Sequence, residues 1–218
     1  MRVSHIFMAL VVALAPLQAQ ACETALVLTI DVSNSVDGGE FILQTEGLAD
    51  ALRDPEIIDA MVSSQAHLAV VQWSGADKQE LTIPWTPILT EFDALALSDR
   101  ARNIQRAFVL SDTAPAEAIW FSLGLFDGVP HCEKRVIDVS GDGTPNSGSE
   151  TRDARNAAER ANVTINGIAI ESMGLAITNY YRNAVITRNG FVITARTHRD
   201  YPNAIRSKIL RELSLALG

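Results

Sequence analysis

Residues 25–35 read ALVLTIDVSNS, an apolar run that passes directly into a polar one. Residues 25–30 form a nearly continuous apolar run, rich in β-branched side chains and without polar alternation. Such a run is typical of a strand buried on both faces, as in a parallel sheet. The run ends at Asp31, and polar side chains follow at once. The sequence therefore predicts a central strand whose carboxyl end carries a polar loop.

Strands and helices are expected to alternate along the rest of the chain. We expect further strands at residues 67–73, 80–85, 135–139, 163–170 and 191–195, and helices at residues 40–52, 92–109, 116–126, 150–161, 177–186 and 201–217, with one more turn at 57–61. The turn-like residues 74–77 join the second and third strands as a hairpin, and Pro84 belongs at a sheet edge. This order predicts an α/β fold with a mostly parallel sheet and helices on both faces.

Composition restricts the class of protein. The chain has 218 residues, of which 47% are hydrophobic and 20% charged, and this is enough for one sizeable core. Its 18 basic residues against 26 acidic ones give a net charge of −8. No stretch concentrates Lys or Arg as a phosphate-backbone binder requires, so we expect no nucleic-acid partner. Without repeats or linkers, residues 22–218 are expected to form a single domain.

Residues 1–21 have the pattern of a secretory signal peptide. Arg2 supplies the positive start, residues 6–17 the apolar run, and Ala19-Gln20-Ala21 the cleavage site. The apolar run, about twelve residues, is too short to span a bilayer, so a retained anchor is the weaker interpretation. No later stretch is long and apolar enough for a transmembrane segment. We expect a periplasmic or secreted protein.

The two cysteines, Cys22 and Cys132, allow two interpretations. Cleavage after Ala21 would place Cys22 at the new N-terminus, as in a lipoprotein. Bacterial lipid-attachment sites usually carry Leu three residues before the Cys, however, and this chain has Ala19. A disulfide in an oxidising compartment is the alternative.

Oxygen-bearing side chains follow two of the expected strands. Asp31, Ser33 and Ser35 alternate in one short loop, and Asp142 follows the strand at residues 135–139. In open α/β sheets, ligands bind at the carboxyl ends of the strands. Carboxylates and hydroxyls suit Mg²⁺, with Mn²⁺ or Ca²⁺ possible. In the alternative, Asp31 and the serines only cap a helix that begins near Asp37.

Zinc is disfavoured at this stage because the histidines are scattered along the chain. They stand at positions 5, 67, 131 and 198, and no Cys/His cluster is visible in the spacing. The metal prediction therefore depends on oxygen ligands alone.

These elements resemble the von Willebrand factor type A domain and its metal-ion-dependent adhesion site. The resemblance rests on a buried first strand ending in Asp31-x-Ser33-x-Ser35, a later Thr before a helix, and a strand ending in Gly141-Asp142-Gly143. It spans roughly residues 25–217. The segments at 27–36, 135–148 and 163–170 are further similar to a bacterial group of secreted proteins catalogued as a domain of unknown function. The resemblance implies a three-layer, Rossmann-like fold with about six strands, one of them an antiparallel edge strand.

The resemblance also implies a set of metal ligands. Ser33, Ser35 and Thr113 would bind through their hydroxyls, with Thr113 in the loop before the helix at 116–126. Asp31 and Asp142 would bind directly or through water. The sixth position would stay open for a carboxylate from a partner protein with an exposed acidic residue.

The loop around Thr113 departs from the family pattern. Family members often have Gly-Gly before the Thr, whereas this chain has Ser111-Asp112-Thr113. Asp112, a possible rim residue, would either tighten the metal or crowd out an acidic partner. Thr113 itself has an alternative role as the N-cap of the following helix, with Glu117 on its first turn.

Two further positions carry structural alternatives. Asn146 and its neighbour Ser147 either line the rim of the site or belong to a plain turn rich in Pro, Asn, Ser and Gly. Asp138 lies inside the strand at 135–139, and a structural partner such as Arg135 or a backbone N–H is favoured over chemistry.

The resemblance pairs the two cysteines. Cys22 lies 31 − 22 = 9 residues before Asp31, and Cys132 lies 142 − 132 = 10 residues before Asp142. In this fold the two strands are adjacent and parallel, so a Cys22–Cys132 disulfide is implied. Closing a loop of that length stabilises the fold by up to about 4–5 kcal/mol in the chain-entropy model.

Three functions are compared. The first is a non-enzymatic, metal-dependent protein-binding module of the adhesion or scaffold type that coordinates Mg²⁺. The second is a hydrolase. It is disfavoured because Ser33 stands where phosphatases with an Asp nucleophile need a second Asp, and the chain has no Gly-x-Ser-x-Gly elbow or P-loop. The third is a scaffold of the same fold with a non-functional metal site. We predict the first, and hence no enzyme.

Overall fold

The structure is a computed structural model that describes residues 22–171 and 174–214. The signal peptide predicted at residues 1–21 and the last residues of the helix predicted at 201–217 lie outside the described residues.

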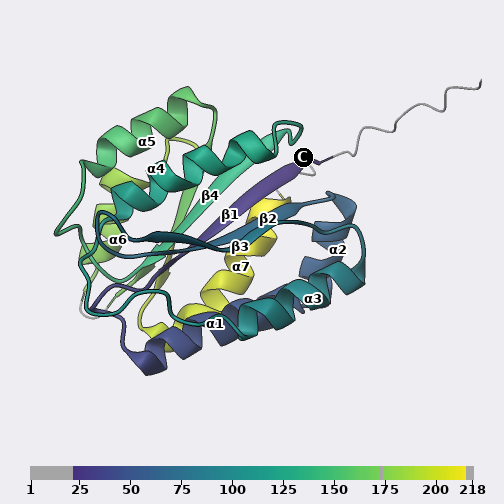
Figure 1. Ribbon diagram of the computed structural model, residues 1–218, viewed down its shortest axis with the longest axis horizontal. Helices are drawn as coiled ribbons and strands as arrows, with labels where there is room; N and C mark the ends of the chain where they lie inside the picture. The colour runs from purple at the N-terminus through teal and green to yellow at the C-terminus, as the bar shows by residue number, and fades with distance from the viewer. Residues whose placement is uncertain (1–21, 172–173, 215–218) are drawn as a thin grey trace, which may run out of the picture.

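A six-stranded sheet forms the centre of the fold (Figure 1). Its strands are β1 (Thr24–Asp31), β2 (His67–Trp73), β3 (Gln79–Pro87), β4 (Lys134–Gly141), β5 (Thr164–Ile170) and β6 (Val192–Ala195). Their spatial order is β3-β2-β1-β4-β5-β6, and β3 alone runs antiparallel to its neighbour. This arrangement confirms the predicted fold class. Pro84 lies exposed in the edge strand β3, where its missing N–H costs no hydrogen bond to a second neighbour.

Helices cover both faces of the sheet (Figure 1). They are α1 (Gly38–Leu52), α2 (Pro55–Ser63), α3 (Glu91–Arg102), α4 (Pro115–Leu125), η1 (Phe126–Gly128), α5 (Thr151–Arg160), α6 (Ala176–Tyr180), the π-helical turn η2 (Tyr181–Val185), η3 (His198–Asp200) and α7 (Tyr201–Ser214). Buried residues of α1, α2, α3 and α7 share one hydrophobic core with the sheet, and α4, α5 and η2 share the other. Within the described residues, no helix combines the length and apolar character needed to cross a bilayer.

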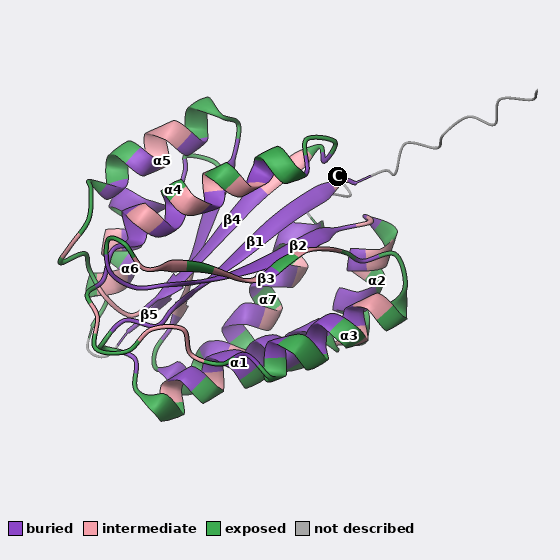
Figure 2. Cartoon of the chain, viewed as in Figure 1, coloured by how far each residue is buried: buried purple, intermediate pink, exposed green. Residues whose placement is uncertain are grey.

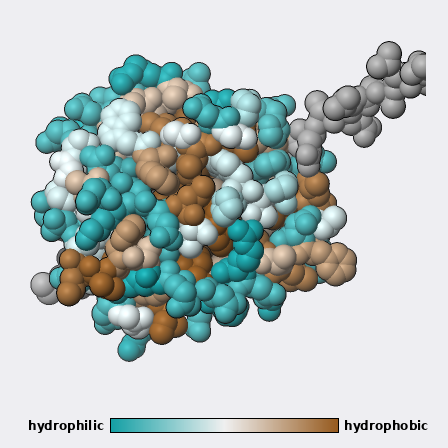
Figure 3. Space-filling model, viewed as in Figure 1, coloured by the Kyte–Doolittle hydropathy of each residue, from teal (hydrophilic) through white to brown (hydrophobic). Residues whose placement is uncertain are grey.

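Strand β1 separates the two cores. All eight of its residues are buried, and Figure 2 shows it in purple at the middle of the molecule. Leu26 and Leu28 pack into the core under α1 and α7, while Ala25 and Val27 pack into the core under α4. A strand covered on both faces excludes polar alternation, and this explains the continuous apolar run in the sequence. On the face seen in Figure 3, hydrophilic side chains are interspersed with hydrophobic patches, one of them near the middle.

The helix predicted at residues 92–109 is wrong in its second half. Helix α3 ends at Arg102, and residues 103–114 form a loop. The buried side chain of Gln72 holds this loop: its Oε1 accepts from Ala107 N at 3.0 Å, and its Nε2 donates to the Gln105 carbonyl at 2.9 Å. The N–H of Ala107 and the carbonyl of Gln105 therefore bond to Gln72 and not to other backbone groups within a helix.

The two cysteines form a disulfide at the amino ends of β1 and β4. The Cα atoms of Cys22 and Cys132 lie 4.5 Å apart. The parallel register pairs Thr24 with Lys134, and Lys134 N donates to the Glu23 carbonyl at 2.8 Å. The pairing of these strands therefore brings the sulfur atoms together.

Asp138 has a different partner from the one favoured by the sequence. Its carboxylate lies 2.8 Å from Lys208 Nζ of α7, so the expected structural partner exists, but it is Lys208 and not Arg135. Lys208 also contacts Glu212 at 2.5 Å, and Asn166 donates to Glu212 at 2.8 Å. Lys208, Asp138 and Glu212 are buried. Burial raises the pKa of Asp138 to about 7, while Lys208 opposes and Glu212 adds to the rise.

Replacing Lys208 tests this buried network. In Lys208→Met, Asp138 and Glu212 would remain buried without a cation, and we expect a loss of about 3–5 kcal/mol in unfolding free energy, measured by urea denaturation. Lys78→Met in the β2–β3 turn is the control and should change stability by no more than about 0.5 kcal/mol. Equal effects of the two substitutions would contradict a structural role for the network.

Candidate metal centre

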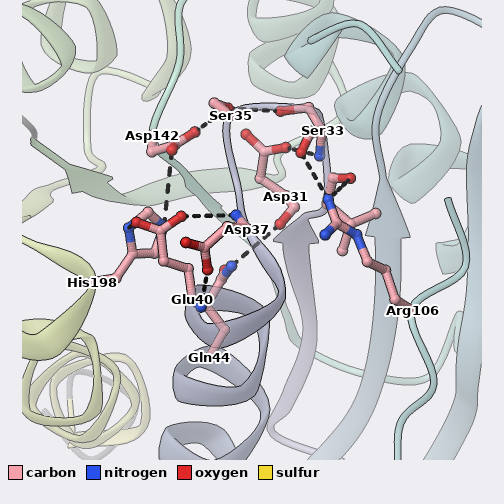
Figure 4. A network of polar contacts seen from close by, with 10 residues as sticks. Asp31, Ser33, Ser35, Asp37, Glu40, Gln44, Arg106, Asp142 and His198 are labelled. Carbon is pink, nitrogen blue, oxygen red and sulfur yellow. Dashed lines mark hydrogen bonds and ion pairs between the residues drawn. The ribbon is translucent and has the colours of Figure 1, made fainter. Parts of the chain in front are cut away.

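The polar loop expected after the first strand lies at the carboxyl edge of the sheet. Asp31 is the last residue of β1, Ser33 and Ser35 lie in the loop before α1, and Asp142 directly follows β4 (Figure 4). Because β1 and β4 are parallel neighbours with Ile30 opposite Ser140, the two carboxylates lie at one edge.

A chain of short contacts links these side chains. Oδ1 of Asp31 accepts from the backbone N of Ser33 at 2.8 Å. The hydroxyl oxygens of Ser33 and Ser35 lie 3.1 Å apart, and the Ser35 hydroxyl donates to Oδ1 of Asp142 at 2.5 Å (Figure 4). The structure therefore brings four of the five predicted ligands into one contiguous group.

Thr113 reaches the same group from the loop before α4. Its backbone N donates to Oδ1 of Asn146 at 2.8 Å, and the backbone N of Asn146 donates back to the Thr113 carbonyl at 3.0 Å. A Cβ atom built on Gly143 would lie 3.5 Å from Oγ1 of Thr113 and 3.9 Å from Oγ of Ser35. Both hydroxyls therefore border one small space beside Gly143, and Asn146 positions Thr113 there.

Both capping alternatives are wrong. Helix α1 is capped by Asp37, whose side chain accepts from Glu40 N at 2.8 Å while Glu40 bonds back to Asp37 N. Helix α4 has Ala114 at its N-cap and no side-chain capping bond. Asp31 and Thr113 are thus not used to satisfy helix termini.

The departure at Ser111-Asp112-Thr113 is accommodated through backbone bonds. The Ser111 carbonyl accepts from Asn34 N at 2.9 Å, and the Asp112 carbonyl accepts from the hydroxyl of Ser74 at 2.9 Å. The side chain of Asp112 is exposed, and its role as a rim residue stays a prediction. This loop is therefore tied to both the Asp31 loop and the end of β2.

Sequence reasoning missed two residues that hold the Asp31 loop. The guanidinium of Arg106 donates to the carbonyls of Val32 and Ser33, both at 2.9 Å (Figure 4). Gln44 of α1 donates to the Asp31 carbonyl at 3.3 Å. Arg106 was hidden because the sequence placed it within a helix, and its spacing carries no signal of this contact.

The donor set fits a hard divalent cation. Asp31 is fully buried, and its Oδ2 has no hydrogen-bond partner among the described residues. Burial raises the pKa of Asp31 to about 7, although hydrogen bonds from Ser33 oppose the rise. A buried carboxylate without a compensating cation is costly, and the surrounding donors are all oxygen atoms. The group can therefore hold a divalent cation.

A pocket of about 430 Å³ adjoins this group. It is lined by Ser35, Glu40, Asp142, Glu171, Thr197 and His198. Nδ1 of His198 lies 3.0 Å from Glu40, and its Nε2 lies 3.9 Å from Oδ2 of Asp142 (Figure 4). His198, which the sequence left unconnected to the site, thus lies at its edge.

One protein family matches nearly the whole chain. The profile of a family described as "Protein of unknown function (DUF1194)" matches residues 21–216. A search of curated proteins finds no match.

Solved structures share the fold. Proximal thread matrix protein 1 from the mussel byssus matches with a TM-score of 0.67 and 14% identity over 88% of this chain and 47% of that chain. A von Willebrand factor type A protein from Catenulispora acidiphila matches with a TM-score of 0.62 and 18% identity over 88% and 43%. The von Willebrand factor domain of the type V pili tip protein Mfa5 from Porphyromonas gingivalis matches with a TM-score of 0.61 and 10% identity over 91% and 97%.

These likenesses establish the fold as that of von Willebrand factor type A domains. The chain spans about half the length of the mussel and Catenulispora proteins and nearly all of the Mfa5 domain. Another structure of the mussel protein has zinc in its MIDAS motif, the metal-ion-dependent adhesion site. It matches with a TM-score of 0.59 and 14% identity over 87% of this chain and 46% of that chain.

The raised pKa of Asp31 predicts a pH dependence of stability in metal-free protein. The folded state holds this proton up to about pH 7, whereas the unfolded state releases it near the ordinary aspartate pKa of 3.8. Stability should therefore fall as pH rises between these values. Between about pH 5 and 7, Asp31 accounts for a loss of about 2–3 kcal/mol.

Urea unfolding with chelator present, in the wild type and in Asp31→Asn, measures this effect. In Asp31→Asn, the unfolding free energy should no longer show the decrease with pH that Asp31 causes. Asp138 contributes the same pH dependence to both proteins, so its contribution cancels in the comparison. Identical pH profiles would contradict a buried, unpartnered Asp31.

Proposed function

This chain belongs to the family described as a protein of unknown function, DUF1194, and we propose that it is a metal-dependent protein-binding module that works outside the cytoplasm. The observation that carries the proposal is the convergence of Asp31, Ser33, Ser35, Thr113 and Asp142 at one edge of a von Willebrand type A sheet.

In this proposal the five side chains hold Mg²⁺. Ser33, Ser35 and Thr113 supply hydroxyl oxygens, and Asp31 and Asp142 bind directly or through water. Mn²⁺ or Ca²⁺ would use the same oxygen donors. When bound, the cation supplies a Lewis-acidic position that an outside ligand can complete.

The charges of the proposed ligands favour an acidic partner. Three of the five are neutral hydroxyls, so the protein contributes only the two carboxylate charges of Asp31 and Asp142. A cation with weak hydroxyl donors retains affinity for a further carboxylate. An exposed Asp or Glu of another protein would fill the open position, and no reaction is required of the site.

The pocket beside Asp142 adds a second feature to the proposed partner. Glu40 and Glu171 line it together with Asp142, so its potential is negative. A second acidic group of the partner would be repelled there, whereas a basic or hydrogen-bond-donating group would be attracted. We therefore propose an acidic partner residue flanked by a donor group.

The comparisons support binding rather than catalysis. The matched proteins include a byssus matrix protein and a pilus tip protein. A leader at residues 1–21 remains a prediction and agrees with a role in the periplasm or outside the cell. A scaffold of the same fold that binds no metal is the competing function.

Titration with Mg²⁺ and Mn²⁺ tests the site. We expect either cation to stabilise the wild type by about 2.7 kcal/mol at one hundred times its dissociation constant. Ser33→Ala and Asp142→Ala should each weaken binding at least about tenfold, since each removes an oxygen donor from the cation. Calorimetry and thermal unfolding measure both quantities.

Asp77→Asn serves as the matched control for charge. Asp77 is an exposed acidic residue in the β2–β3 turn, and its substitution should leave cation binding unchanged. A wild type that responds to neither cation would favour the metal-free scaffold.

Partner capture tests the role of the cation. Immobilised protein, incubated with an envelope extract of the source cells and Mg²⁺, should retain proteins that chelator releases. Beads carrying Asp142→Ala should not retain them, because the cation is no longer held. Equal capture by the two proteins, or capture that survives chelation, would contradict a metal-dependent interface.

A further inference from the structure

The opposite end of the sheet gathers a second group of side chains that bind metals. Strands β2, β1 and β4 are consecutive in the sheet, and their amino ends lie together. His67 is the first residue of β2, Cys22 lies two residues before β1 begins at Thr24, and His131 and Cys132 precede β4. The same parallel pairing that aligns Asp31 with Asp142 therefore aligns these four residues at the far edge.

The four side chains form a compact cluster. One ligand atom from each of Cys22, His67, His131 and Cys132 lies within 4.8 Å of each of the others. The imidazole rings of His67 and His131 meet edge to face, with centroids 5.2 Å apart. His131 is exposed, and the other three are buried. The sequence-based conclusion that no Cys/His cluster exists is therefore wrong in three dimensions.

The hydrogen bond of His67 engages one of its two ring nitrogens. Its Nδ1 lies 3.2 Å from the carbonyl oxygen of Gln65. A carbonyl only accepts, so Nδ1 carries the proton and Nε2 keeps its lone pair. When one ring nitrogen of a histidine binds a metal, the other nitrogen usually donates its N–H to a group such as a backbone carbonyl.

We propose that Cys22, Cys132, His67 and His131 form a zinc site when the disulfide is reduced. Two thiolates and two imidazoles are a usual ligand set for tetrahedral structural zinc. One ligand atom from each of the four residues already lies within 4.8 Å of the others. Closing it around zinc requires separation of the two sulfur atoms and small side-chain movements.

The proposed conversion has two steps, reduction of the disulfide and binding of zinc. A dithiol reductant gives two electrons and two protons to the Cys22–Cys132 bond and becomes a disulfide itself, leaving two thiols. Zn²⁺ then binds both sulfurs as thiolates and both imidazoles as neutral ligands, with release of the two thiol protons. The disulfide and the zinc site are mutually exclusive, so the edge has an oxidised, metal-free form and a reduced, zinc-bound form.

Cobalt substitution tests the proposal on the full chain. Protein carrying Asp142→Ala, which weakens the oxygen site, is reduced with excess dithiol, freed of it under nitrogen and titrated with Co²⁺ and then Zn²⁺. We expect one equivalent of Co²⁺ with the intense visible absorption of tetrahedral coordination and a thiolate charge-transfer band. Zn²⁺ should displace it, and the unreduced protein should show neither band.

Variants assign the ligands. Cys22→Ser with Cys132→Ser should abolish the charge-transfer band, and His67→Gln or His131→Gln should each weaken zinc binding at least about 100-fold. Glu133→Gln, which changes an exposed acid next to Cys132, should leave zinc binding unchanged.

Two results would overturn the proposal. One is reduced protein that shows no thiolate band with Co²⁺. The other is reduced protein that circular dichroism shows to be unfolded and that zinc does not refold. Neither result bears on the oxygen site, which is assayed in the oxidised wild type.

Discussion

The burial of β1 between two parallel neighbours is the constraint on which the other features depend. Every residue of β1 is buried, and its backbone pairs with β2 on one side and β4 on the other. A strand in this position has no freedom of register, because a shift by one residue would exchange its two core faces. The chemistry at both of its ends is therefore positioned by packing rather than by local sequence.

Parallel pairing gives the sheet two chemically distinct edges. At the carboxyl edge, carboxylates and hydroxyls from three loops meet, and these are donors for hard cations. At the amino edge, two cysteines and two histidines meet, and these are donors for zinc. The two sets lie at opposite ends of the same strands. Each edge can consequently be altered by substitution without removing ligands from the other.

The two buried aspartates show different solutions to one electrostatic problem. Asp138 lies inside β4 and contacts the buried Lys208, so it has a cationic partner within the core. Asp31 lies at the end of β1, and its Oδ2 has no protein partner among the described residues. A core carboxylate with an internal cation is structural, whereas one without it is suited to bind a cation from solution. This contrast separates a stabilising group from a candidate ligand more clearly than sequence position does.

The sequence by itself determined the alternation of strands and helices, the buried first strand and the positions of Asp31, Ser33 and Ser35, since these follow from local periodicity and spacing. It also placed Asp142 at the end of a later strand, and only the resemblance to the von Willebrand factor type A domain made that strand a neighbour of the first. Only the packing of the folded chain reveals that Arg106 and Gln44 hold the Asp31 loop, that Lys208 pairs with Asp138, and that residues 103–109 lie outside helix α3. It also brought His67 and His131 to the cysteines. These contacts join residues far apart in the chain through side chains whose spacing has no period, so only the packing of the sheet reveals them.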